Sequence, residues 1–153
     1  MSLDHPQVMM PPPALYLGGL LMGYGIDRAI HFPAVQFPGS VWLTSLLAAS
    51  GLLLVVLAAL QLRRARTTLM PHRAASTLLT TGVFAMSRNP IYLGFSLLAI
   101  AAALSQQSAG MLLMQLPVLW VIHSHVIAAE EAFHEQQFGE AWQQYRNRTR
   151  RWL

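Results

Sequence analysis

The residues from Val41 to Leu60 form an apolar stretch without a single charged side chain. A helix needs about 20 largely apolar residues to cross the hydrocarbon core of a bilayer, and this stretch has that length. The composition agrees, because 54% of the residues are hydrophobic and only 10% are charged, whereas soluble domains carry about 25% charged residues. A chain so poor in charge cannot cover a water-facing globule, so we expect lipid to surround part of the molecule.

Three further segments have a comparable length and apolar character. The sequence therefore predicts an all-α, polytopic membrane protein with four transmembrane helices in a single membrane domain of residues 1–153. Its polar tail carries aromatic residues at helical spacing, which indicates an amphipathic helix at the membrane interface, either a lid or an anchor. The predicted parts are spans at residues 14–32, 41–60, 90–108 and 109–129, a cytoplasmic loop at 61–89 and a cytoplasmic tail at 130–153.

The distribution of arginine orients these spans. All ten basic residues are arginine, and all except Arg28 lie in the loop 61–89 or in the tail 130–153. Segments rich in arginine stay on the cytoplasmic side of a membrane. We therefore expect an integral protein of a bacterial inner membrane with both termini in the cytoplasm. The arginines sit at the ends of apolar segments, so we expect membrane lipids and no nucleic acid as partners.

The turn before the third predicted span combines an arginine with a helix start. Asparagine accepts hydrogen bonds from first-turn amides and proline tolerates the first helical position, so Asn89-Pro90 predicts the beginning of a helix. Its unpaired amides and positive dipole end would lie beside Arg88, an arrangement that favours a carboxylate or a phosphate. Gly94 removes side-chain bulk in the same helix, so a ligand or another helix can come close.

A second group of polar residues follows the fourth predicted span. His123, Glu130 and His134 are spaced by seven and four residues, which places them on one face of a regular helix. Glu130 and Glu131 are neighbours near anionic lipid headgroups, so they need a partner such as Arg88 or a cationic ligand. Glu131 and His134 have the Glu-x-x-His spacing of di-iron bundles, but such sites need a second copy that this chain lacks. We predict no metal site.

The first predicted span contains two small residues four positions apart. Gly19 and Gly23 match the small-xxx-small pattern that lets helices approach closely. This pattern fits a homodimer formed through Gly19 and Gly23, and it also fits packing between helices of one chain. We favour packing within the chain.

The order of the motifs resembles the isoprenylcysteine carboxyl methyltransferase family, with which phosphatidylethanolamine methyltransferases share a general pattern. The motifs are Leu-x-Thr-x-Gly at 78–82, Arg-Asn-Pro-x-Tyr-x-Gly at 88–94, an apolar hairpin, Glu-Glu at 130–131, and Phe-Gly-x-x-x-x-x-Tyr at 138–145 before a basic end. The resemblance covers about residues 67–152. It implies an integral membrane methyltransferase that moves a methyl group from S-adenosylmethionine to a lipophilic small molecule or lipid at the membrane–cytosol interface.

The resemblance also implies where the cofactor binds, between the hairpin and the cytoplasmic loop. The family's cofactor contacts fall here on Ser76, Thr77, Leu78, Leu79, Phe84, Asn89, Pro90, Ile91, Tyr92 and Glu130. If the acceptor has to lose a proton, a base near this site is needed. The candidate catalytic residues are Arg88, His123, His125 and Glu131, and the sequence leaves the choice among them open.

This chain departs from the isoprenylcysteine enzymes at several positions. Asn89, Phe84 and Ser76 stand where those enzymes usually have histidine, tyrosine and histidine, and Val126 replaces an arginine that contacts the substrate. A lipophilic amine, acid or thiol is therefore as good a candidate acceptor as a prenylcysteine carboxylate. Two other functions stay open: a membrane reductase similar to steroid 5α-reductases, and a non-enzymatic membrane protein that binds or assembles lipid.

Overall fold

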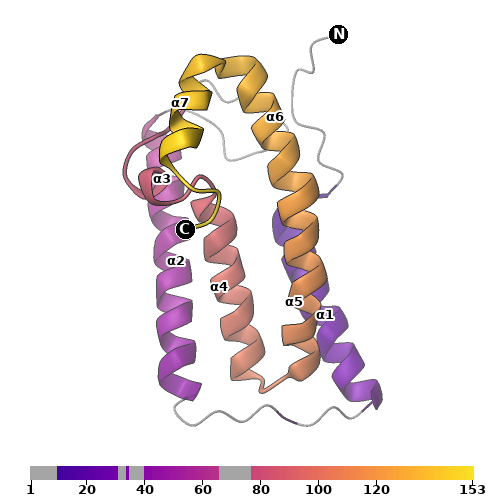
Figure 1. The fold of residues 1–153 in the computed structure, drawn as a ribbon. Helices are drawn as coiled ribbons and strands as arrows, with labels where there is room; N and C mark the ends of the chain where they lie inside the picture. The colour runs from indigo at the N-terminus through magenta and orange to yellow at the C-terminus, as the bar shows by residue number, and fades with distance from the viewer. Residues whose placement is uncertain (1–9, 31–33, 35–39, 66–76) are drawn as a thin grey trace.

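The computed structural model describes residues 10–30, 34, 40–65 and 77–153, and every regular element within these ranges is a helix (Figure 1). The all-α prediction is therefore confirmed for the described part of the chain. The elements are α1 (Pro12–Ile30), α2 (Ser40–Arg64), α3 (Val83–Met86), α4 (Pro90–Ser105), α5 (Ala109–Val121), a π-helix η1 (Ile122–Val126), α6 (Ile127–Phe138) and α7 (Glu140–Arg148).

The long helices form a bundle in which α1 packs against α5, α2 against α4, and α4 against α5. The tight hairpin between the third and fourth predicted spans is present, although α4 already ends at Ser105 and not at residue 108. The next helix begins directly afterwards, because the Ser108 hydroxyl accepts a hydrogen bond from the Met111 amide at 3.0 Å. Figure 1 shows α3, α7 and the C-terminus together at the opposite end, near the start of α4.

Two helices of the described ranges are long and apolar enough to cross a membrane. They comprise Val41–Arg64 and Ala109–Phe138, while α4 is a shorter apolar helix. Large apolar side chains such as Leu21, Leu46 and Leu116 are exposed on α1, α2 and α5. A surface of this kind is expected where lipid, and not water, covers a helix.

The helix that contains the fourth predicted span is longer than that span, because α5, η1 and α6 form one continuous helix as far as Phe138. The helix thus continues beyond residue 129, where the predicted span ends. Glu130 and Glu131 lie within this helix, and both carboxylates have partners within the chain. The helix ends at Gly139, whose φ of 50° is a left-handed conformation that glycine adopts without strain.

Helix α7 differs from the amphipathic interfacial helix predicted for the tail. Its aromatic residues Trp142 and Tyr145 are buried, with 3% and 6% of their surfaces exposed. They pack against the chain, which fits the lid and not the anchor of the two predicted alternatives. The residues that cover them, among them Phe84 and Arg88, are distant in sequence. Helix α7 thus lies as a cover over the end of the bundle.

Glycine allows the backbones of α1 and α5 to come close. A Cβ atom on Gly23 would lie 2.5 Å from both the Gly110 carbonyl oxygen and the Met111 Cα atom, and one on Gly19 would lie 2.6 Å from a methyl group of Val118. Both glycines are used in packing within the chain, as we favoured from the sequence. Gly94 plays a similar role toward α2, since its Cβ would lie 2.8 Å from the Gly51 carbonyl oxygen.

Gly23→Ala is expected to destabilise the protein by about 1–3 kcal/mol, because the new methyl group overlaps backbone atoms that cannot rotate away. The measurement is the unfolding midpoint of purified protein in detergent. Gly25→Ala is the matched control, since it lies in the same helix and a Cβ there has no neighbour within 4 Å. Equal effects of both substitutions would show that the close approach of α1 and α5 does not limit stability.

Candidate functional site

The start of α4 and the first turn of α6 meet through a hydrogen bond. The Tyr92 hydroxyl donates to Oε1 of Glu130 at 2.6 Å, across 38 positions of sequence. Tyr16 of α1 binds to the same part of α4, because its hydroxyl lies 3.1 Å from the Tyr92 carbonyl oxygen and 2.9 Å from Oγ of Ser96. The hairpin therefore brings together two residues of the predicted cofactor site, Tyr92 and Glu130.

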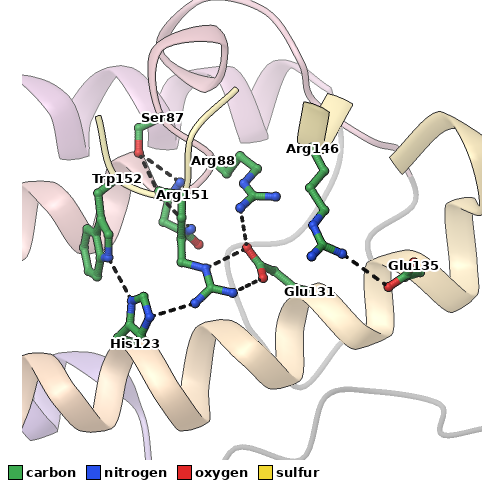
Figure 2. Close-up of polar contacts among 9 residues, drawn as sticks. Ser87, Arg88, His123, Glu131, Glu135, Arg146, Arg151 and Trp152 are labelled. Carbon is green, nitrogen blue, oxygen red and sulfur yellow. Dashed lines mark hydrogen bonds and ion pairs between the residues drawn. The ribbon is translucent and has the colours of Figure 1, made fainter. Parts of the chain in front are cut away.

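Glu131, the next residue, pairs with two arginines (Figure 2). Nη2 of Arg88 lies 3.1 Å from Oε1 of Glu131, and the guanidinium group of Arg151 contacts both carboxylate oxygens. The side chains of Arg88 and Glu131 are only 9% and 12% exposed. Arg88, the expected cationic partner, thus pairs with Glu131. The partner of Glu130 is the hydroxyl group of Tyr92.

The last residues of the chain lie over the turn before α4. The Arg88 amide donates to the Arg150 carbonyl oxygen at 3.0 Å, and the Asn89 side-chain amide donates to the Arg151 carbonyl oxygen at 3.0 Å. Asn89 precedes α4 as predicted, but its side chain does not cap the helix. The predicted cap is wrong because the C-terminal segment offers Asn89 an acceptor that no local pattern reveals. The amides of the first turn of α4 therefore receive no side-chain acceptor from Asn89.

The π-helix η1 changes which residues of the long helix share a face. The expected alignment of His123 with Glu130 is wrong, because a π turn takes up about one residue more than an α turn. His123 aligns instead with Glu131, and Arg151 contacts both: its Nη1 lies 2.9 Å from Nε2 of His123. The Trp152 indole also donates to Nδ1 of His123, at 3.1 Å (Figure 2).

The other two histidines within the described residues, His125 and His134, lie outside this network. His125 is exposed and packs against Trp120, with 5.1 Å between the ring centroids. His134 packs against Trp142, with centroids 5.0 Å apart, instead of facing Glu130.

Burial lowers the pKa of the Arg88 guanidinium, with neighbouring Glu131 opposing the shift. Within the described residues no group of three or more histidine and carboxylate side chains is placed to hold a metal ion.

Helix α7 contributes the cover of the site. The Tyr145 hydroxyl donates to the Phe84 carbonyl oxygen at 2.6 Å and so joins α7 to α3. Burial raises the pKa of Tyr145 to about 12, although the nearby Arg88 charge opposes this shift. The phenol therefore stays neutral and keeps its proton as a hydrogen-bond donor. This hydrogen bond holds Phe84, one of the residues predicted to contact the cofactor, beneath α7.

The structure brings together only some of the residues expected to contact the cofactor. Asn89, Tyr92 and Glu130 have contacts that join the start of α4 to α6 or to the C-terminal segment, and the contact of Phe84 joins α3 to α7. Thr77 is exposed and Leu78 and Leu79 are half-buried in the segment that leads to α3, Pro90 is buried, Ile91 is half-buried, and Ser76 lies outside the described residues.

Sequence reasoning missed Tyr16, Arg151 and Trp152. Tyr16 is one of several aromatic residues in an apolar segment, and its depth in the bundle follows only from the packing of α1 on α4 and α5. The Arg151-Trp152 pair looks like an ordinary membrane-surface anchor. Its contacts with Glu131 and His123 cross 20 and more positions of sequence. No local signal predicts them.

Comparisons with known proteins match much, but not all, of the part of the chain that builds this site. The profile of the phospholipid methyltransferase family matches residues 40–141, which include Arg88, Tyr92 and Glu130. The chain is also similar to protein-S-isoprenylcysteine O-methyltransferase of Schizosaccharomyces pombe, with 33% identity over 72 residues. These residues make up 47% of this chain and 30% of the relative's length. No solved structure matches the chain.

Proposed function

We propose, since this chain belongs to the phospholipid methyltransferase family, that it transfers a methyl group from S-adenosylmethionine to a lipophilic acceptor at the membrane–cytosol interface. The family resemblance that we inferred from the ordered motifs is confirmed by the matched profile and by the isoprenylcysteine relative. The observation that carries the proposal is the Tyr92–Glu130 junction, which joins two separate family motifs at one end of the bundle.

The residues at this junction fit the donor molecule. Tyr92 bonds only Oε1 of Glu130, and a carboxylate has acceptor capacity for further donors such as ribose hydroxyls or an ammonium group. The first-turn amides of α4, which Asn89 leaves uncapped, suit a carboxylate. When bound, S-adenosylmethionine supplies a methyl group on a sulfonium that is already activated for attack. The chain then has to orient the acceptor and exclude water.

The geometry ranks the candidate catalytic residues. The carboxylate of Glu131 is already engaged by the guanidinium groups of Arg88 and Arg151, so it is not free to meet an acceptor molecule. His125 lies with Trp120 and away from the Glu131 network. His123 contacts Arg151 and Trp152, so it can accept a proton only after one of these side chains has moved. We propose His123 as the base for acceptors that must be deprotonated, and Arg88 as a binding residue.

The test of the proposed function is transfer of a tritiated methyl group by purified protein in nanodiscs. We expect label from S-adenosylmethionine to enter the organic-solvent-soluble fraction when lipophilic amines, acids or thiols are supplied. Each acceptor is compared with a version that lacks the acyl or prenyl chain. A clear preference for the chain-free versions would contradict a lipophilic acceptor, and incorporation into neither fraction would contradict methyl transfer to these classes.

We further propose that α1, α2, α4 and the long helix from Ala109 all cross the membrane, with both termini in the cytoplasm. Topology reporters fused after Gln107 and after Leu153 should then report opposite sides of the membrane, because these sites lie at opposite ends of the bundle (Figure 1). A third reporter fused at the start of the chain should agree with the one after Leu153. The same compartment for Gln107 and Leu153 would contradict the proposed topology.

A further inference from the structure

Both ring nitrogens of His123 face hydrogen-bond donors (Figure 2). Nη1 of Arg151 lies 2.9 Å from Nε2, and the indole Nε1 of Trp152 lies 3.1 Å from Nδ1. Guanidinium and indole nitrogens only donate, whereas a neutral imidazole has one accepting nitrogen and one N–H group. One of the two contacts is therefore a hydrogen bond at any moment, and the other brings two donors together.

The end of the chain is anchored just before Trp152. The Arg150 carbonyl oxygen accepts from a backbone amide of the turn before α4, and the Arg151 carbonyl oxygen accepts from the Asn89 side chain, each at 3.0 Å. Trp152 follows these two anchors, and its indole N–H is directed at His123. The contact with His123 thus holds the part of the chain that lies beyond the anchors.

Trp152 also covers part of the bundle core. It is half-buried and packs against the core cluster that includes Tyr92 and Val126. Its ring lies nearly parallel to that of His123, with an interplanar angle of 13° and centroids 6.4 Å apart. Packing and one N–H contact therefore set its position, and loss of the contact leaves packing alone.

A proton on His123 removes the last acceptor in this arrangement. Both nitrogens of an imidazolium donate, so Arg151 and Trp152 would each face another donor. Two donors that face each other without an acceptor lose the hydrogen bonds that they would make to water. His123 is exposed, so a proton reaches it without unfolding of the bundle.

The charges around His123 act in the same direction. Among the described residues, Arg151 lies against the ring, and its partner Glu131 is shared with Arg88. Two guanidinium groups already face one carboxylate there, and a protonated His123 would add a third cation. The neighbouring titratable side chain of η1, His125, packs against Trp120 instead.

We propose that Trp152 is a proton-operated gate on the core cluster, held closed by neutral His123 and released when His123 is protonated. The anchors at Arg150 and Arg151 remain, so opening moves the end of the chain from Trp152 onward. Imidazole side chains change charge between about pH 5 and 8, which places the response near physiological pH. The gate does not depend on methyl transfer, and it is measured without S-adenosylmethionine.

The test is electron paramagnetic resonance of the full chain in nanodiscs, with a nitroxide label on Leu153→Cys. The chain contains no cysteine, so the label attaches at one position, and Leu153 is 67% exposed. Lowering the pH from about 8 to about 5 should shift the equilibrium toward mobile label about tenfold or more, because protonation turns both contacts of His123 into donor–donor contacts.

His123→Gln should abolish this shift, since a carboxamide keeps an acceptor oxygen at every pH. The variant retains the other histidines and Glu131, so a lost response identifies His123 as the sensor. His125→Gln is the matched control in the same π-helix and should respond like the unsubstituted chain. Trp152→Phe keeps an aromatic ring and removes the N–H donor, so its shift should be at least about threefold smaller.

Circular dichroism establishes that each labelled variant is folded, and Trp152→Phe tests the gate even if His123→Gln does not fold. A label whose mobility is the same at both pH values would overturn the proposal. An undiminished shift in folded His123→Gln or in Trp152→Phe would overturn it as well, and loss of the shift in His125→Gln would assign the sensor to another residue. Failure of the methyl-transfer assay has no bearing on these outcomes.

Discussion

Glu131→Ala is expected to lower the free energy of unfolding by about 3–5 kcal/mol. The substitution leaves Arg88 buried without its counter-charge and releases Arg151 from the same carboxylate. Because Arg88 is only 9% exposed, water can hydrate the abandoned charge only if the turn before α4 opens. Chemical denaturation of the purified protein in detergent, followed by far-ultraviolet circular dichroism, measures this loss.

Glu135→Ala is the matched control in the same helix. Glu135 also pairs with an arginine, but its oxygen lies 3.8 Å from Nη1 of Arg146, and both side chains are about half exposed, at 45% and 51%. Exposed ion pairs contribute about 0–1 kcal/mol, so little change is expected. If Glu131→Ala lowers the free energy of unfolding no more than Glu135→Ala does, the Glu131 carboxylate does not hold the C-terminal segment against the bundle.

Glu130→Ala is expected to weaken binding of S-adenosylmethionine by about tenfold to a hundredfold, which corresponds to roughly 1–3 kcal/mol. The substitution removes the acceptor on which ribose hydroxyls or the ammonium group of the cofactor would depend, and it leaves the Tyr92 hydroxyl without its partner. Isothermal titration calorimetry on monodisperse protein measures the affinity. Tyr92→Phe should have a smaller effect, because Glu130 then keeps its acceptor oxygens but loses the bond that orients them.

Gln143→Ala is the control for this prediction. Gln143 is an exposed residue of α7 whose side-chain amide reaches Glu135 at 3.4 Å, so its truncation should leave cofactor affinity unchanged. Normal affinity in a well-folded Glu130→Ala protein would mean that the cofactor binds elsewhere. A loss that is equal in Gln143→Ala would point to a general defect of the cytoplasmic end.

Local patterns predicted the parts of this molecule that depend on neighbouring residues. The start of α4 at Pro90 follows from the fixed φ angle of proline, and the apolar run from Val41 follows from the length that a span needs. The packing role of Gly19 and Gly23 follows from spacing along one helix face. In each case the cause lies within one turn or one helix.

The parts that were wrong depend on contacts between distant segments. Asn89 does not cap α4 because the Arg151 carbonyl oxygen, 62 positions away, accepts from its side chain. The register of His123 follows from a π turn that no spacing rule anticipates. A single sequence carries little information about such partners, since each residue type has many that would serve.

Equilibrium binding of radiolabelled S-adenosylmethionine to the purified protein tests the central claim most directly. We expect saturable binding that unlabelled S-adenosylhomocysteine displaces, that a nicotinamide cofactor does not displace, and that Glu130→Ala weakens while Gln143→Ala does not. Absence of saturable binding to folded protein, or binding of the nicotinamide cofactor in its place, would contradict the assignment of this chain as a methyltransferase.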